Sequence, residues 1–576
     1  MRVAARTRQR EARFAILGSC ALPLVLLTVG AASGCGKRPD VPLRLEPIPY
    51  ADTLPIERPQ DQAANEVERL IDQSVGEQIG HGLSLRKLLG AKHEALNVTH
   101  FDDVVNSAWF EHRNARHRMT PGEVARGPTT AGPETATLTV IAGKTTGISP
   151  GFTVRDANGQ TFLFKFDPKG NLHLASAAGV ISSRLFWAAG YFTPEDYIVV
   201  FDSARLELDL EAELETTENE RLMTEADIQN VLSLTDPLPD GRYLALASKY
   251  VPGRPLGPFH FSGVRRDDPN DYYHHEYRRE LRGLYVMSSW LNHVDMRFAN
   301  TLDVFIDPPG YVRHYLIDFA ATLGSGTIRG HNPREGTEYN FDIWSSLGRI
   351  VTLGFFTKGW EEYEYAELHP SIGWMPADDF DPGGWRPNWP NATFRNSTVR
   401  DSYWGAKLVG SFSDDQIAAA VAEGQLPAAA ARLLAEILIT RRDKTVAYWY
   451  SKVAPIENPV AEIEAGGGSS RLNISFDDLG LAAGIWSPGA TRYEWRFKEP
   501  RCRTSLGGER AAGASARQVI PIELPGQPEA CSAPGQTDFA VLEVKAIRPG
   551  ASGRAAKIYL SWSEEQSIYR VVGLEH

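Results

Sequence analysis

Short stretches in which apolar and polar residues alternate fill much of the first half of the chain. This period of two is typical of β-strands with one buried face. Three such stretches follow one another, at Thr137–Ala142, Gly151–Asp156 and Thr161–Phe166. Asn158-Gly159 is a tight-turn signal between the second and the third. A further strand pattern covers Arg242–Val251 and ends in a Pro-Gly-Arg-Pro connector, so we expect a small sheet in this part.

Apolar residues recur at helical spacing in three longer stretches, which predict helices at Leu174–Gly190, Glu276–Leu291 and about Ala428–Trp449. Another helix is predicted just before the last of these. It opens with a capping box, in which Ser413 is followed three residues later by Gln416.

A predicted hairpin lies at the centre of the chain, within Ser289–Ala320. An apolar strand leads to a turn at Pro309-Gly310, and a second apolar strand runs toward Asp318. A hairpin of this length returns its far end to the neighbourhood of its start. Asp295, Asn300 and Asp318 should therefore converge at one sheet edge, as a pocket suited to a divalent cation and a phosphate.

The last hundred residues are predicted to form a small all-β sandwich that serves as an accessory or binding module. Pro455–Pro459 and Gly466–Ser470 mark a linker before it. Cys502 and Cys531 can pair in an exported protein, and two separate thiols are the alternative. The expected strands are Arg471–Phe476, Tyr493–Phe497, Val519–Leu524, Val541–Ile547 and Lys557–Trp562.

The start of the chain has the pattern of a secretory signal peptide, with five arginines ahead of the apolar run Phe14–Gly30. Ala32-Ser33-Gly34-Cys35 resembles the lipobox of bacterial lipoproteins, which implies cleavage before Cys35 and acylation of its thiol. Gly36 after the cysteine favours the outer membrane. A simple membrane-anchoring helix is the alternative reading. The prediction is a cell-envelope protein, outside the cytoplasm, attached to a lipid membrane.

Composition narrows the picture further. The chain has 576 residues, which suggests two or three domains. A formal charge of −12 argues against a nucleic-acid partner. The sequence contains no Cys-x-x-Cys pair, which argues against a structural zinc site. Residues 36–60 are rich in proline and predict a stiff tether, and residues 61–135 read as a helical and irregular extension with one helix near 67–79.

Lys165 lies inside an apolar strand, between Phe164 and Phe166. It is either a phosphate-binding lysine or an edge-strand lysine that opposes aggregation. Gly143-Lys144-Thr145 looks like the end of a P-loop, but Leu138 stands where its first glycine is required, and we do not expect one.

The order of these features resembles that of protein-kinase-like enzymes over about residues 137–450. His293-x-Asp295 with Asn300 is similar to their catalytic loop, and Ile317-Asp318-Phe319 to their metal-binding Asp-Phe element. The spacing between Asn300 and Asp318 is closer to HipA-like and phosphoinositide-kinase-like proteins. The resemblance implies an α+β, two-lobed kinase-like domain at 136–455, with lobes 136–252 and 253–455, followed by the β-rich domain at 470–576.

The resemblance also implies a role for each matched residue. Asp295 would orient or deprotonate the acceptor hydroxyl, Asn300 and Asp318 would bind Mg²⁺, and Lys165 would hold the phosphates of ATP. The backbone near Lys249 and Val251 would face the adenine.

Two positions depart from the kinase pattern. No acid occurs between Leu172 and Gly190, where kinases supply a glutamate for the lysine, and Ala320 replaces the glycine after Asp-Phe. The sequence thus favours an envelope lipoprotein that binds nucleotide and Mg²⁺ and transfers phosphate to an unknown acceptor. The alternative is a catalytically inactive envelope protein, a binding or structural module whose β domain contacts a protein partner. An aspartate-based hydrolase is a weaker third reading, because no second base is evident.

Overall fold

The computed structural model describes eleven segments of the chain. The predictions for the signal peptide, for Cys35 and for a helix near 67–79 fall outside them. The described segments are 51–62, 92–144, 149–215, 220–341, 351–352, 358–362, 368–465, 470–526, 528–531, 539–551 and 553–576.

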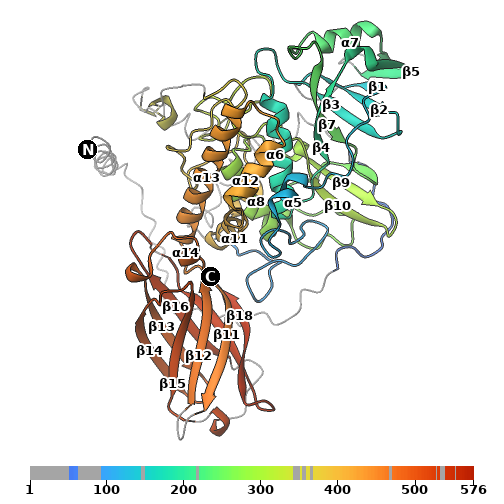
Figure 1. Ribbon diagram of the computed structural model, residues 1–576. Coiled ribbons are helices and arrows are strands. Elements are labelled where there is room, and N and C mark those ends of the chain that lie inside the picture. The colour runs from blue at the N-terminus through green and yellow to red at the C-terminus, as the bar shows by residue number, and fades with distance from the viewer. Residues whose placement is uncertain are drawn as a thin grey trace. The chain divides into compact units, whose positions relative to one another are not determined.

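A seven-stranded sheet forms the first part of the fold (Figure 1), with the strand order β4-β7-β3-β2-β1-β5-β6. All neighbouring pairs are antiparallel except β1 and β5, which are parallel. The predicted strands are confirmed. Strand β5 is rich in acidic residues, which the sequence did not mark as a strand. The bounds are β1 Leu138–Gly143, β2 Gly151–Asp156, β3 Thr161–Lys165, β4 Asp196–Phe201, β5 Leu206–Glu215, β6 Glu220–Leu222 and β7 Tyr243–Lys249.

Helix α6 (Leu174–Ala189) packs closely against this sheet. A Cβ added to Gly179 would come within 2.7 Å of the Leu246 side chain on β7, so only a small residue fits there. Asp167, buried between β3 and α6, accepts hydrogen bonds from the backbone N–H groups of His173, Ala175 and Ser176 at 2.8 Å each. This carboxylate fixes the passage from the lysine strand into the helix.

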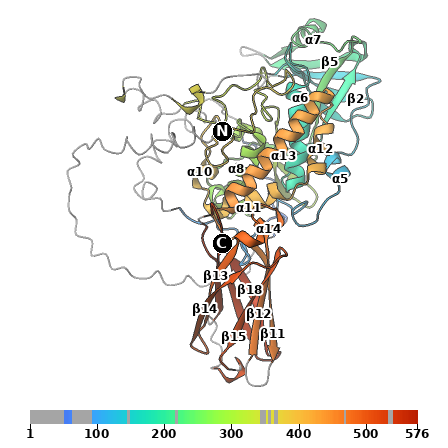
Figure 2. The ribbon, with the colours of Figure 1, turned by 60° about the vertical axis from the view of Figure 1, so that its left-hand side comes forward.

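The helical part is built around α8, which is buried along its whole length. Helix α11 packs against α8 and α13, and α12 packs against α13 and α6 (Figures 1 and 2). The predicted capping box of α12 is confirmed, with Ser413 accepting from the Gln416 N–H. The bounds are α5 Pro121–Arg126, α7 Glu225–Leu232, α8 Arg279–Leu291, α10 Ala392–Asn396, α11 Val399–Gly410, α12 Asp414–Ala422, α13 Ala428–Tyr450 and α14 Leu479–Ala482.

The predicted central hairpin is confirmed. Strands β9 (Thr301–Ile306) and β10 (Tyr311–Leu316) pair antiparallel, and β8 (Arg254–Gly257) adds to β9. Leu316 lies opposite Thr301. This register brings the residues just before β9 next to those just after β10.

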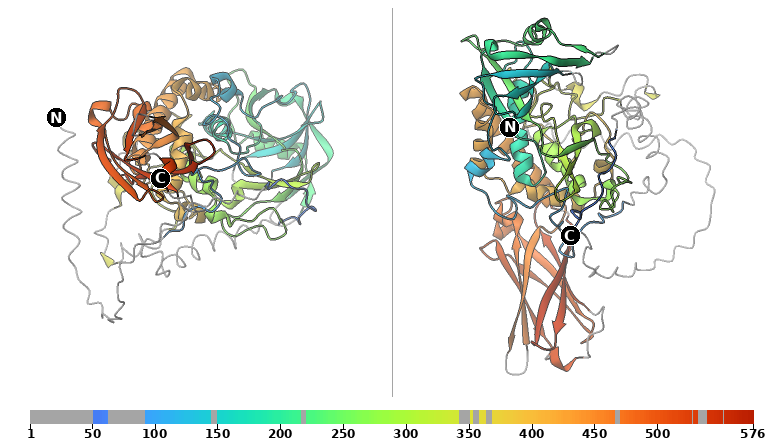
Figure 3. Two further views of the ribbon diagram at one scale, coloured as in Figure 1. Left: turned by 90° about the horizontal axis from the view of Figure 1, so that it is seen from below. Right: turned by 90° about the vertical axis from the view of Figure 1, so that its right-hand side faces the viewer.

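Two antiparallel sheets form the C-terminal part and enclose a common apolar core (Figure 3). Their orders are β11-β12-β15 and β14-β13-β16-β17-β18. The five predicted strands are confirmed, and three more were missed. The bounds are β11 Ile456–Ala465, β12 Ser470–Asp478, β13 Arg492–Glu499, β14 Thr504–Ala511, β15 Arg517–Leu524, β16 Ala540–Ile547, β17 Ala556–Ser563 and β18 Ile568–Glu575.

The linker predicted at Pro455–Pro459 is wrong, because these residues lead into and form part of strand β11. Its second predicted part, Gly466–Ser470, lies outside the described residues except for Ser470, where β12 begins. The pairing of β11 with β12 shifts register between Glu457 and Val460. Pro459 lies at this irregularity, on an edge strand of its sheet. A proline is tolerated at such a place because it has no N–H to contribute to the ladder.

Among the described residues, no helix is both long enough and apolar enough to cross a membrane.

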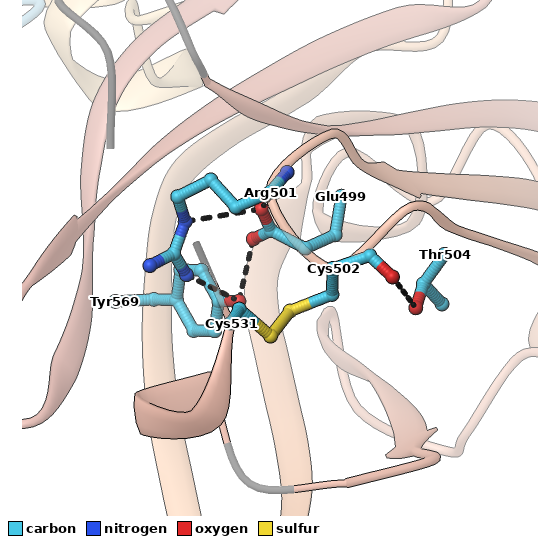
Figure 4. The surroundings of a disulfide bond; sticks show 6 residues. All are labelled: Glu499, Arg501, Cys502, Thr504, Cys531 and Tyr569. Carbon is cyan, nitrogen blue, oxygen red and sulfur yellow. Dashed lines mark hydrogen bonds and ion pairs between the residues drawn. A yellow bond between two sulfur atoms is a disulfide. The ribbon is translucent and has the colours of Figure 1, made fainter. Parts of the chain in front are cut away.

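A disulfide joins Cys502 to Cys531, whose Cα atoms lie 5.0 Å apart (Figure 4). Beside it, the Arg501 guanidinium lies 3.2 Å from the Glu499 carboxylate, and the Tyr569 hydroxyl donates to the same carboxylate.

Removal of this disulfide should lower the free energy of unfolding. The bond closes a loop with a sequence separation of 29 residues. Restricting such a loop in the unfolded chain stabilises the fold by about 3 kcal/mol. Urea unfolding of the C502S/C531S double variant should show this loss, and a reducing agent should then have no further effect. Equal stability of wild type and variant under oxidising conditions would contradict the expectation.

Candidate functional site

The candidate site centres on an ion pair between strand β3 and the segment after β10. The Lys165 Nζ atom lies 2.8 Å from Asp318 Oδ1. The lysine side chain is 11% exposed and the aspartate side chain 42%, so the carboxylate is open to a ligand. Burial alone would raise the pKa of Asp318, but Lys165, Lys144 and His293 outweigh it and hold this pKa below its usual value. Asp318 is therefore an anion at neutral pH.

The hairpin register places Asp318 beside the predicted catalytic loop. The Ile317 N–H donates to the Asn300 carbonyl at 3.0 Å, and Asp318 takes the left-handed backbone conformation, with φ of 59°. Phe319 turns into the core and stacks on Phe186 of α6, with ring centroids 5.0 Å apart. The Asp318 carboxylate thus lies at the site, while the Phe319 ring anchors this segment in the core.

Asp295 and Asn300 form the second half of the site. The Asn300 side-chain amide donates to the Asp295 carbonyl at 2.7 Å and to its Oδ2 at 2.9 Å. Burial raises the pKa of Asp295, and the negative charge of Asp318 adds to this, although Arg297 and Asn300 oppose it. A carboxylate with a raised pKa is a better proton acceptor. Its side chain keeps 25% exposure.

Hydrogen bonds from Arg441 and Asn388 hold the loop that carries Asp295 in place. Arg441 of α13 donates to the carbonyls of Ser289 and Trp290 at the end of α8, at 2.7 and 2.9 Å. The Asn388 N–H donates to the Val294 carbonyl at 2.7 Å. His293 is buried, and burial lowers its pKa to about 4, so its ring is neutral at physiological pH. Such support fixes the position of the neighbouring Asp295.

Lys144 also lies near the site, which its Gly-Lys-Thr pattern did not predict. Its N–H donates to the Gly151 carbonyl at 3.4 Å, and Gly151 pairs with Lys165, so Gly151 lies between the two lysines on adjacent strands. Burial and the nearby Lys165 lower the pKa of Lys144 to about 8, against the opposing effect of Asp318. No local sequence signal marks this position, because it follows from how β1, β2 and β3 pair.

The two residues expected to face an adenine lie at the end of β7. The Lys249 N–H donates to the Glu195 carbonyl at 2.9 Å, and the Tyr250 N–H donates to the Thr161 carbonyl at 3.0 Å. The Lys249 amide is thus already paired. Val251, two residues after the end of β7, is half-buried.

The glutamate that kinases place on the helix after the lysine strand is absent from α6. Gly179 makes the close contact with β7, and the Ser182 hydroxyl lies 2.7 Å from that of Thr322. Small residues here let α6 pack tightly on the sheet and on the segment after Asp318. Lys165 pairs with Asp318 instead.

The oxygen donors suit Mg²⁺, which prefers carboxylate and amide oxygens and keeps several waters and phosphate oxygens as further ligands. Asp318 supplies an ionised carboxylate, and the Asn300 amide oxygen is not used in its bonds to Asp295. In the described segments, no group of three or more His, Cys, Asp or Glu could hold a metal by itself. Two cavities of about 380 and 950 Å³ are lined by other residues.

The chain matches no protein-family model and no curated protein sequence. Among solved structures, the crystal structure of a Golgi casein kinase is similar over 70% of this chain and 95% of that one, with 9% identity and a TM-score of 0.27. A similarity this weak does not establish a shared fold or function.

Proposed function

We propose that this protein binds a nucleoside triphosphate with Mg²⁺ and transfers the terminal phosphoryl group to a hydroxyl of an acceptor. The observation that carries the proposal is the contact of Lys165 on the third strand with Asp318, beside the hydrogen-bonded pair Asp295 and Asn300. Kinase-like enzymes place a phosphate-binding lysine, a base, a metal-binding asparagine and a metal-binding aspartate in this order along the chain.

Each residue has a task that its surroundings support. Asp318 and Asn300 would bind Mg²⁺, which neutralises charge on the phosphates. Lys165 and Lys144 would contact phosphate oxygens, and Val251 would adjoin the base. Asp295 would take the proton of the acceptor hydroxyl. At the same time the acceptor oxygen would bond to the terminal phosphorus, and the bond from that phosphorus to the nucleoside diphosphate would break. The chemistry is mainly positioning and charge stabilisation.

The absence of an acid on α6 favours a second candidate, a protein that binds nucleotide without transferring phosphate. In kinases the lysine-glutamate pair must form for activity. Here Lys165 has Asp318 as its partner, and a bound metal would compete for that same carboxylate.

A phosphoryl-transfer assay separates these candidates. The protein is incubated with radiolabelled ATP and Mg²⁺, and phosphate release and incorporation are measured. The proposal predicts turnover that falls about 100-fold or more in Asp295→Asn, since proton transfer contributes on that order. ATP binding should persist in the variant. Binding without any turnover in the wild type would establish the second candidate instead.

Lys144 should make anion binding depend on pH. Its pKa of about 8 means that it loses its positive charge as pH rises through 8. Affinity for ATP should then fall between pH 7 and 9, by up to about tenfold per unit. Calorimetric titrations across this range should show the fall in wild type and a much flatter profile in Lys144→Met. Identical profiles would contradict a phosphate contact from this residue.

We further propose that the protein is exported and attached to a membrane of the cell envelope through acylated Cys35, with the C-terminal β domain available to a protein partner. The N-terminal sequence supports the anchor. Labelled fatty acid should be incorporated into wild type but not into Cys35→Ser, and equal labelling of both would overturn this part.

A further inference from the structure

A cavity of about 380 Å³ lies beside the end of α8, in the helical part of the protein. This volume is within the range of small-molecule sites. Its wall includes Asn292, the residue that ends α8, and Gly336, Trp374, Phe380 and Trp385 from the segments that follow the hairpin. Neither Lys165 nor Asp318 lines it, so it is separate from the proposed phosphate site.

Four aromatic residues, Trp360, Trp374, Phe380 and Trp385, contribute to this wall. Trp374 and Trp385 are 9% and 3% exposed, and the Trp385 indole N–H donates to Asn292 Oδ1 at 2.9 Å, so that ring is held in place. Trp360 also lines the cavity. Its indole nitrogen is buried and has no hydrogen-bond partner in the part of the chain that the structure describes. A buried donor without an acceptor is costly. An oxygen-bearing ligand would supply the acceptor.

The wall also carries four carboxylates, Glu335, Glu338, Asp379 and Asp381, and two cations, Lys358 and Arg441. Glu338 lies 2.8 Å from both Lys358 and Arg334. The Arg441 guanidinium is 3.6 Å from the centroid of the Phe380 ring and donates to three backbone carbonyls. Asp381 lies exposed at the cavity. The carboxylates outnumber the cations, so the wall offers acceptors to hydroxyl groups and disfavours an anionic ligand.

We propose that this cavity binds a neutral carbohydrate. A sugar ring presents an apolar face of C–H groups, which packs on indole rings, and hydroxyls that both donate and accept. The Trp360 N–H would donate to one ring or hydroxyl oxygen, and Asp381 would accept from another hydroxyl. The site goes beyond the proposed phosphoryl transfer and does not depend on it.

The cavity and the loop that carries Asp295 share their supports. The Arg386 N–H donates to the Gly336 carbonyl at 3.0 Å, and two residues later the Asn388 N–H donates to the Val294 carbonyl. A carbohydrate in the cavity would therefore be held next to the segment that positions the proposed base.

Saturation-transfer NMR and calorimetry test the proposal without nucleotide. The probes are glucose, N-acetylglucosamine, maltotetraose and chitotetraose, with glucuronate and inorganic phosphate as charged comparisons. At least one neutral sugar should bind at millimolar concentration. Trp360→Ala and Asp381→Asn should each weaken it by about tenfold or more. Tyr272→Ala, at an exposed aromatic residue elsewhere, should bind as wild type does.

Asp381→Asn changes an exposed side chain and keeps the test valid if Trp360→Ala does not fold. The proposal is overturned if no neutral sugar binds to the full-length protein, if only glucuronate or phosphate binds, or if the folded variants bind as tightly as wild type. If the wild-type protein binds a sugar but shows no ATP turnover, only the phosphoryl-transfer proposal is contradicted.

Discussion

Replacement of Asp318 by alanine should weaken Mg²⁺-dependent ATP binding by about 100-fold or more, since charge-assisted contacts to a metal or phosphate are among the strongest in proteins. Asp318 is the ionised carboxylate of the site and lies 2.8 Å from Lys165. Its loss would remove the proposed metal ligand and leave a nearly buried lysine without its partner. Asp318→Asn should behave similarly, because the shape is kept and the charge is lost.

Calorimetric titration with ATP and Mg²⁺, and again with ATP and a chelator, measures this effect. Asp415→Ala serves as the matched control, because Asp415 is an exposed aspartate in the first turn of α12. It should bind ATP as tightly as wild type. If Asp318→Ala also kept full Mg²⁺-dependent affinity, Asp318 would not be a metal ligand.

The largest effect on stability is expected for Asp102→Ala. The buried carboxylate lies 2.9 Å from both Arg279 and Arg400 and 3.0 Å from His576 Nδ1. Removal of one partner leaves buried cations uncompensated, which typically costs about 3–5 kcal/mol. Urea unfolding should show this loss, whereas the exposed Glu565→Ala should change stability by less than about 0.5 kcal/mol. A loss below about 1 kcal/mol in Asp102→Ala would contradict the network's role.

The same network predicts acid sensitivity. Burial would raise the pKa of Asp102, but Arg279, His576 and Arg400 hold it well below the usual 3.8. A group whose pKa is lower in the folded state stabilises the fold fully above its unfolded pKa, and this stabilisation is lost as pH falls through the folded value. Stability should thus decline below about pH 4, and Asp102→Ala should show a shallower decline in unfolding experiments at pH 7 and pH 3.

Local patterns were sufficient to predict most elements and the central hairpin. The alternation around Pro309-Gly310 fixes β9 and β10, and their register then brings Asn300 next to Ile317. The convergence of Asp295, Asn300 and Asp318 follows from chain geometry over about 25 residues. It needs no knowledge of distant contacts.

Features that depend on distant pairing could not be predicted. Lys144 reaches the site through the register of three strands, and the contact of Asp102 with Arg279 joins residues 177 positions apart. Strand β14 was missed because Gly507 and Gly508 resemble a turn, although they pair with Arg496 and Trp495. The segment around Trp109 and Phe110 showed no periodic pattern, yet both rings are buried in the core.

We propose that the cluster of Lys165, Asp318, Asp295 and Asn300 binds a nucleotide with Mg²⁺. Unfolding of the protein with and without ATP and Mg²⁺ tests it most directly. At 100 times the dissociation constant, the ligand should raise the free energy of unfolding by about 2.7 kcal/mol. Wild type should show this gain with Mg²⁺ present and lose it in the presence of a chelator. No gain at millimolar ATP and Mg²⁺ would contradict it.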